Sequence, residues 1–228
     1  MTNGRSNMRI KANYLDHNFS HRSGDGRIEW IVVHYAGIAC AQGSAAVVAR
    51  SLHNRSKTAC ERSLGRAAST HYVVGDDGII QLVRDRHRAW HVGSYKTTNK
   101  CRAENNNSLG VDLVEHKRNP SSGSVNDNDW YFTASVMQTG AKLVAELAKK
   151  YGIKEDHIVR HFDVTGKLCP KPFVGTYTND VTGAIADEEW RRFLMLVKLF
   201  MDSYGFAGSS PSLTMRLVAA SGTFRLTP

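Results

Sequence analysis

The chain alternates between short apolar runs and polar stretches that contain glycine, a pattern that predicts strands and helices joined by turns. The run Trp30–Tyr35 is apolar except at His34, and we expect it to form a buried strand that Gly37 ends. Residues 108–114 are predicted as another strand, because apolar and polar positions alternate along them. One face of that strand carries Leu109, Val111 and Leu113, and the other carries Gly110 and Asp112.

Two further apolar runs lie on either side of a short polar turn. The runs cover residues 71–74 and 79–83, and Gly75-Asp76-Asp77-Gly78 separates them. Two runs of this length around a glycine-bearing turn are typical of a β-hairpin. A hairpin contains antiparallel strands, so the predicted sheet is mixed rather than purely parallel.

Three segments repeat apolar residues at helical spacing. The first spans about Ser44–Asn54. The second has Thr133 as its expected N-cap and Gly152 as its stop, and the third begins with Asp187 as its expected cap. The positions predicted to face inward are Ala45, Val48 and Leu52 in the first helix, Val136, Gly140, Leu143, Val144, Leu147 and Tyr151 in the second, and Trp190, Phe193, Leu194, Val197 and Met201 in the third.

Strands interspersed with helices predict an α/β fold, a single domain with a central mixed β-sheet flanked by helices. We expect this domain to cover residues 1–201, with an irregular N-terminal segment over 1–28 and an exposed loop over 119–129. Residues 202–228 form a C-terminal tail whose two short runs fit a hairpin. The tail is too short for an independent core, so we expect it to pack on the domain or mediate self-association.

The composition is that of a folded domain, with 41% hydrophobic and 22% charged residues in a chain of 228. No apolar run approaches the roughly 18 residues of a membrane-spanning helix. Residues 1–10 lack the apolar core and cleavage site of a secretory signal, so we expect synthesis in the cytoplasm without a signal peptide.

The net charge of +9 favours anionic polymers as partners, among them nucleic acid, acidic lipid and the bacterial wall. The basic residues are scattered and form no lysine- or arginine-rich block, which argues against nucleic-acid binding as the main function.

The chain contains Cys40, Cys60, Cys101 and Cys169. Thiols stay reduced in the cytoplasm, so a disulfide framework is not expected there. We interpret the first three cysteines as small, partly buried thiols, with a Cys40–Cys60 bridge as the alternative.

His34, His161 and Cys169 are candidate ligands of a catalytic zinc ion, because imidazole and thiolate suit zinc and a catalytic site uses three protein ligands. His34 lies near the end of a predicted strand, where a rigid backbone can hold it. His161 and Cys169 lie eight residues apart in a segment whose glycine and proline predict a loop. The spacing alone is also compatible with an ordinary histidine and cysteine.

The segment His161-Phe162-Asp163-Val164-Thr165-Gly166-Lys167-Leu168-Cys169-Pro170 resembles the metal motif of zinc N-acetylmuramoyl-L-alanine amidases. This is the type 2 family of phage endolysins and bacterial autolysins, related to the peptidoglycan recognition proteins. Other segments resemble the family in the expected order, and the resemblance covers about Tyr14–Met201. They are residues 30–37 for the first-ligand strand, 70–74 for the hairpin, 89–93 for a substrate-groove motif and 107–113 for the strand with an acidic residue.

The resemblance implies a peptidoglycan hydrolase that cleaves the amide between N-acetylmuramic acid and L-alanine with Zn²⁺. His34, His161 and Cys169 then bind the metal, Lys167 stabilises the oxyanion and Asp112 is the candidate general base. The implied substrate-binding residues are Trp90, His91, Thr70, Asn107 and Thr165. Taken by themselves, Lys167 can be a solvated surface lysine, Asp112 a strand residue and Trp90 a packing residue, and His71 is interpreted as structural.

The chain departs from the family pattern at two positions that carry chemistry. Several members have a glutamate where this chain has Asp112, and some phage members have a catalytic tyrosine where it has Thr70. A subgroup that recycles wall fragments has aspartate as the third ligand, so Cys169 favours the endolysin-like branch. We expect the protein to act on the wall after release through a membrane lesion or lysis.

Two other functions use the same features differently. A non-catalytic peptidoglycan receptor with this fold typically lacks the cysteine ligand, so Cys169 argues against it. A basic structural or regulatory binder needs no metal ligands at all.

Overall fold

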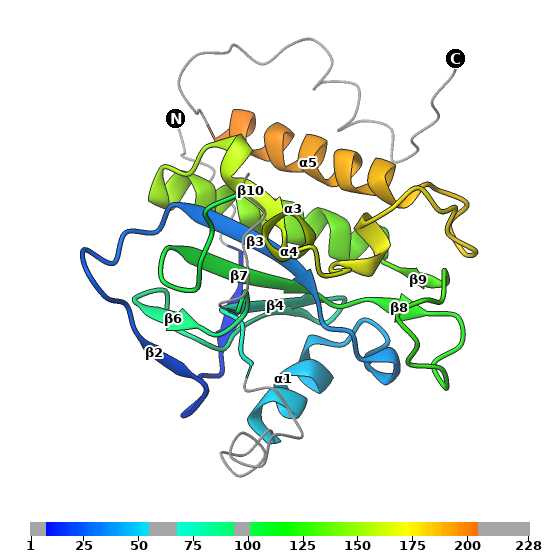
Figure 1. The fold of residues 1–228 in the computed structure, drawn as a ribbon, viewed down its shortest axis with the longest axis horizontal. Helices are drawn as coiled ribbons and strands as arrows, with labels where there is room; N and C mark the ends of the chain where they lie inside the picture. The colour runs from blue at the N-terminus through cyan, green and yellow to red at the C-terminus, as the bar shows by residue number, and fades with distance from the viewer. Residues whose placement is uncertain (1–7, 55–67, 94–100, 205–228) are drawn as a thin grey trace.

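A mixed sheet of six strands forms the centre of the molecule in the computed structural model, which describes residues 8–54, 68–93 and 101–204 (Figure 1). Neighbouring strands are parallel except for the hairpin pair β4 and β5, so the predicted mixed sheet is confirmed. The strand order is β1 (Ile10–Ala12), β5 (Gly78–Gln81), β4 (Tyr72–Gly75), β7 (Ser108–Leu113), β3 (Trp30–Tyr35) and β10 (Ile158–Arg160).

The strands β7 and β3 lie in the interior of this sheet and show why it is stable. Ile31, Val32 and Val33 are fully buried, because side chains pack on both faces of a central parallel strand. Leu109, Val111 and Leu113 are also fully buried, and they enter the core on one face as the alternation predicted. The opposite face of both strands is left for polar residues at their C-terminal ends.

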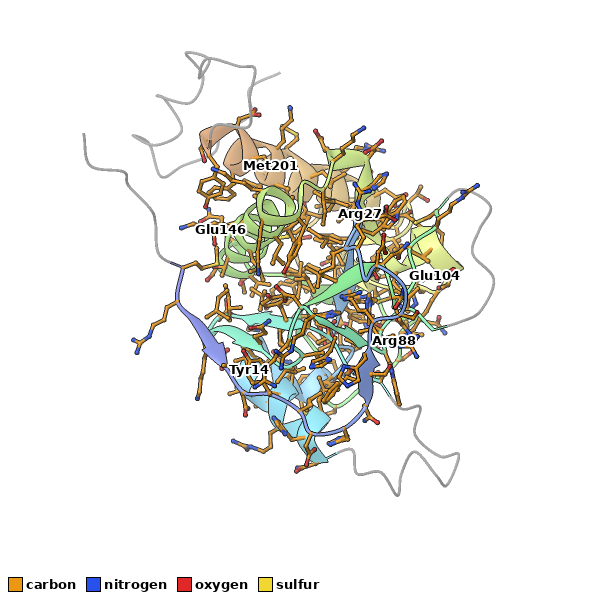
Figure 2. The ribbon with its side chains drawn as sticks, turned by 90° about the vertical axis from the view of Figure 1, so that its left-hand side faces the viewer. Tyr14, Arg27, Arg88, Glu104, Glu146 and Met201 are labelled. Atoms are coloured by element: carbon orange, nitrogen blue, oxygen red, sulfur yellow. The ribbon has the colours of Figure 1, made fainter. Side chains whose placement is uncertain are left out.

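Helices cover both faces of the sheet (Figure 1). On one face lie α3 (Ala134–Tyr151) and α5 (Ala186–Ser203), which pack against each other and enclose the larger core. Side chains fill the space between these helices and the sheet (Figure 2). The other face carries α1 (Ala45–Asn54), whose buried residues contact β4 and β5. All three helices lie where the apolar spacing predicted them, and none of those in the described part of the chain could span a membrane.

The helix α3 begins and ends at the predicted residues. The Thr133 hydroxyl accepts a hydrogen bond from the Val136 amide, and Gly152 adopts the left-handed conformation that ends many helices.

Replacing Thr133 with alanine should lower the free energy of unfolding by about 1 kcal/mol, because one amide of the first turn of α3 loses its acceptor. The Thr133 hydroxyl also donates to Asp76 at 2.6 Å, so both contacts are lost together. Denaturant unfolding measures the change, and Thr133→Ser is the control because it keeps the oxygen. Equal stability of the alanine and serine variants would contradict the capping role.

The N-terminal segment is more ordered than the predicted irregular stretch over 1–28. Within it, β1 extends the edge of the main sheet, and β2 (Phe19–His21) pairs with β6 (His87–Ala89) in a separate ribbon. Both strands have three residues, too few to display an alternating pattern. The half-buried Arg22 then holds the segment on the domain, because its guanidinium donates to the carbonyls of Asp85, Asn106 and Ser108.

The start of α5 also differs from the prediction. Asp187 lies inside the first turn, and Ile185 occupies the cap position without a side-chain hydrogen bond. The Asp187 carboxylate instead accepts from Arg160 at 2.8 Å and from the Gly175 amide at 3.1 Å. The ion pair with Arg160, which is distant in sequence, therefore takes the place of the N-cap hydrogen bond that Asp187 was predicted to make. The helix continues to Ser203, two residues beyond the predicted domain boundary at Met201.

Short elements connect the layers. The predicted loop over 119–129 lies between β8 (His116–Lys117) and β9 (Trp130–Tyr131), and buried Lys117 pairs there with Asp127 and Asp129. The remaining elements are η1 (Ala39–Ala41), η2 (Glu155–His157), α4 (His161–Thr165) and η3 (Lys171–Phe173). Cys60 of the alternative disulfide and the tail from residue 205 onward lie outside the described residues.

Candidate metal centre

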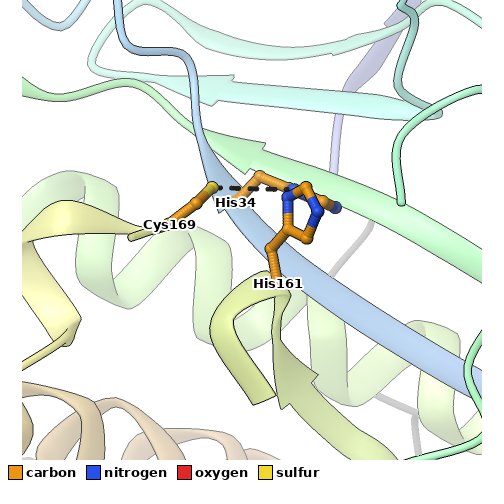
Figure 3. Close-up of side chains that lie close together, drawn as sticks. All are labelled: His34, His161 and Cys169. Atoms are coloured by element: carbon orange, nitrogen blue, oxygen red, sulfur yellow. Dashed lines mark hydrogen bonds between the residues drawn. The ribbon is translucent and has the colours of Figure 1, made fainter. Parts of the chain in front are cut away.

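The three predicted ligands meet at one edge of the sheet (Figure 3). The strands β3 and β10 are parallel, with Arg160 opposite Val33, so His161 follows β10 beside His34. The predicted loop over 161–169 begins instead as the short helix α4, with His161 as its first residue. The chain then returns to the site, and the Phe162 amide donates to the Cys169 carbonyl at 2.8 Å.

The ligand atoms lie at distances that fit a single metal ion. Nδ1 of His34 is 3.1 Å from Nδ1 of His161 and 3.8 Å from Sγ of Cys169. Zinc at ordinary bond lengths in a tetrahedral site separates two nitrogens by about 3.3 Å and a nitrogen from a sulfur by about 3.6 Å. The three side chains are only 2–5% exposed, so these donors are already shielded from water. The group can therefore hold a metal ion.

The charge state of the site also suits a cation. Burial lowers the pKa of His34 well below its usual value and that of His161 to about 4, with further lowering from the positive charge of Lys167. Both rings are therefore uncharged near neutral pH and offer a lone pair. Burial raises the pKa of the Cys169 thiol to about 12, and Lys167 and the Tyr35 amide act in the opposite direction. A bound cation would displace the thiol proton and complete the ligand set.

Asp112 lies beside the ligand group. It is directly opposite His34 in the parallel pairing of β3 and β7, and opposite Val73 on its other side. Residues paired in this way point to the same face of a sheet, so the Asp112 carboxylate shares the face of His34. Its negative charge also contributes to raising the pKa of Cys169. The predicted face is confirmed, and the role as general base stays a prediction.

Lys167 and Thr165 lie on the turn between the second and third ligands. Lys167 is exposed, and its charge lowers the pKa of His34, His161 and Cys169. The Thr165 hydroxyl donates to the His161 carbonyl and accepts from the Lys167 amide, both at 3.3 Å. Thr165 thus links the ligand to the lysine, while substrate binding by Thr165 stays a prediction.

The other predicted groove residues have contacts within the protein. The Trp90 indole donates to Ser20 at 3.1 Å, and Thr70 is buried beneath the surface with its hydroxyl 3.5 Å from the Tyr72 carbonyl. The Asn107 side chain accepts from the Glu104 amide and donates to the Arg102 carbonyl, which holds the turn before β7. A role for the three residues in substrate binding stays a prediction.

His91 contacts a ligand, which the sequence did not indicate. Its Nδ1 lies 3.0 Å from Nε2 of His34, and its Nε2 lies 3.2 Å from the Ser108 hydroxyl. His71, in contrast, is structural as interpreted from the sequence. Its Nδ1 accepts from the Gly110 amide at 2.9 Å, and its Nε2 lies 3.0 Å from the His87 carbonyl.

Glu115 is a second residue that sequence reasoning missed. Its carboxylate is almost fully buried and accepts hydrogen bonds from the amides of Ala36 and Ile38 at 3.0 and 2.7 Å. Burial raises its pKa to about 7. The side chain fixes the loop that follows β3 and thereby the end of the strand that carries His34. A glutamate just after a strand has no distinctive local pattern, so the sequence held no signal for this role.

The comparisons with known proteins agree with this geometry. A family model described as N-acetylmuramoyl-L-alanine amidase matches residues 24–172. The amidase CwlL of Bacillus licheniformis is 31% identical over 150 residues, which cover 64% of this chain and 37% of that protein. The amidase CwlA of Bacillus subtilis is 34% identical over 104 residues, 46% of this chain and 33% of that protein. The chain thus spans little more than a third of these curated relatives.

Solved structures share the fold at low sequence identity. The catalytic domain of XlyA superposes with a TM-score of 0.55 at 22% identity and covers 83% of this chain and 99% of its own. A selenomethionine derivative of AmpD has a TM-score of 0.55 at 18% identity, covering 82% and 94%.

Proposed function

We propose that this chain, which belongs to the N-acetylmuramoyl-L-alanine amidase family, is a zinc enzyme that hydrolyses the amide bond between N-acetylmuramic acid and L-alanine in peptidoglycan. The observation that carries the proposal is the buried group His34, His161 and Cys169, whose ligand atoms all lie within 4.8 Å of one another. Three protein ligands leave one position for water or substrate, the arrangement of catalytic rather than structural zinc sites.

Two side chains of the protein, Asp112 and Lys167, take part in the proposed hydrolysis beside the metal ligands. When bound at this group, zinc polarises the scissile carbonyl and lowers the pKa of a water molecule toward about 7. The Asp112 carboxylate, on the same sheet face as His34, accepts the proton of the attacking water. The Lys167 ammonium stabilises the negative charge that develops on the carbonyl oxygen. Asp112 then returns the proton to the amide nitrogen, the C–N bond breaks and L-alanine leaves as the free amine, with no organic cofactor.

The test is incubation of the zinc-loaded protein with cell walls of several peptidoglycan types and with a small soluble muropeptide. Mass spectrometry of the soluble products should find free stem peptides that begin with L-alanine, together with intact glycan. Cleavage within the glycan or within the stem peptide would contradict the proposed bond. Wall binding without any soluble product would favour the non-catalytic receptor instead.

Replacing Lys167 with alanine should lower kcat by about 10²–10³-fold, the usual cost of losing one preorganised oxyanion donor. The zinc content should stay near one per chain, because Lys167 is not among the ligands. Steady-state kinetics with the small muropeptide and elemental analysis measure the two quantities. Lys154→Ala is the matched control, since Lys154 is also exposed but precedes β10, at the opposite end of that strand from His161. An unchanged kcat would show that Lys167 is a solvated surface lysine and does not stabilise the oxyanion.

A further inference from the structure

Two consecutive residues, His91 and Val92, contact the two histidine ligands. His34 directs Nδ1 toward the other ligands and Nε2 toward Nδ1 of His91, at 3.0 Å. His161 also directs Nδ1 toward His34, at 3.1 Å, and its ring has a hydrogen bond with the backbone of Val92. The segment 91–92 therefore contacts both imidazoles, and His91 contacts His34 through the ring nitrogen that faces away from the other ligands.

The contacts of His91 define one consistent direction of hydrogen bonding. A metal at Nδ1 of His34 leaves the ring proton on Nε2, which donates to Nδ1 of His91. An uncharged His91 then carries its own proton on Nε2 and donates to the Ser108 hydroxyl at 3.2 Å. Ser108 in turn donates to the backbone carbonyl of Glu104. Each group donates once toward the next, so the series ends on a fixed backbone acceptor.

Gly110 provides the room that His91 needs. A Cβ atom built at Gly110 would lie 2.8 Å from Cγ and 3.0 Å from Nδ1 of His91. The missing side chain lets the imidazole lie against β7, between the strand and His34. This close approach explains a glycine at an interior strand position, where glycine otherwise weakens the strand.

We propose that His91 is a positioning residue that fixes the orientation and tautomer of His34 for metal binding, with Ser108 anchoring His91. The inference rests on the proposed function for the identity of the metal, and it replaces a direct substrate contact as the main role of His91. A ligand ring whose second nitrogen has a fixed acceptor is preorganised, and loss of such a partner typically lowers metal affinity by about 10- to 100-fold.

The test measures zinc affinity in the absence of substrate, by competition with a chelator whose absorbance reports zinc. His91→Phe keeps a ring of similar size without an acceptor, so its Kd for zinc should rise by about 10- to 100-fold. His91→Asn places an amide oxygen near the position of Nδ1, so it should bind zinc more tightly than the phenylalanine variant. Ser108→Ala removes only the anchor and should give a smaller loss than His91→Phe.

The outcomes separate this inference from its alternatives. Circular dichroism identifies any variant that has not folded, and Ser108→Ala, which changes one buried hydroxyl, then decides the question. Unchanged zinc affinity in a folded His91→Phe or in Ser108→Ala would overturn the inference. A raised KM for muropeptide at saturating zinc, with unchanged zinc affinity, would indicate that His91 binds substrate. The proposed function would not be affected by that result. Failure of the unaltered protein to bind zinc would overturn both proposals.

Discussion

Replacing His34 with alanine should abolish hydrolysis of muropeptide and leave most of the fold intact. Two of the three donors would remain, too few for the ligand set of a catalytic zinc site, so the zinc content should fall well below one per chain. The strand itself should persist, because Ile31, Val32 and Val33 are fully buried on both faces of the sheet. Turnover of the small muropeptide, elemental analysis and circular dichroism measure the three effects.

His157→Ala is the matched control for this substitution. His157 stacks on Trp30 at the start of β3, with ring centroids 3.8 Å apart, and lies at the end of β10 away from His161. The control variant should keep both zinc and activity. A chelator should inactivate the unaltered protein and added zinc should restore it. A well-folded, metal-free preparation that still hydrolysed substrate would end the zinc hypothesis.

The topology explains why these ligands meet although they are far apart in the chain. His34 and His161 each lie at the carboxyl end of a parallel strand or directly after one, and β3 and β10 are neighbours. Carboxyl ends of parallel strands form one edge of a sheet, which is where open α/β sheets usually place their sites. Asp112, on the adjacent strand β7, reaches the same edge for the same reason.

The parts of the fold that the sequence predicted correctly have strong local patterns. The alternation of residues 108–113 gave the buried face of β7, and Thr133 and Gly152 gave both ends of α3. Patterns of this kind report periodicity over several residues. The three-residue strands β1 and β2 have no such period. Their partner strands, and the carbonyls to which Arg22 donates, are distant in sequence.

The candidate site shows the same division between local and long-range information. Resemblance indicated His34, His161 and Cys169 because their motifs are recognisable in isolation, and the structure brings them together. The contact between His91 and His34 depends on how residues 91–92 lie against β7 and β3. That placement comes from Gly110 and from the Asn105 side chain, which accepts from the amides of His91 and Val92. No local pattern encodes such a long-range arrangement.

Replacing Asp112 with asparagine should lower kcat by about 10²–10⁴-fold, the usual contribution of a positioned general base. Asparagine has nearly the same size and can accept a hydrogen bond, but it cannot take up a proton at neutral pH. The zinc content should stay near one per chain, because Asp112 is outside the ligand group. Single-turnover kinetics with muropeptide and elemental analysis on the same preparation separate loss of proton transfer from loss of metal.

Asp112→Glu is the informative control, because it keeps a carboxylate at this position. The longer side chain keeps the carboxylate on the face shared with His34, so partial activity is expected where asparagine has almost none. A structural role predicts a different result. The strand would then lose stability on Asp112→Asn, the melting temperature would fall, and kcat would stay within a few-fold of the unaltered protein. That outcome would mean that a group other than Asp112 accepts the proton, and it would not change the assignment of the metal ligands.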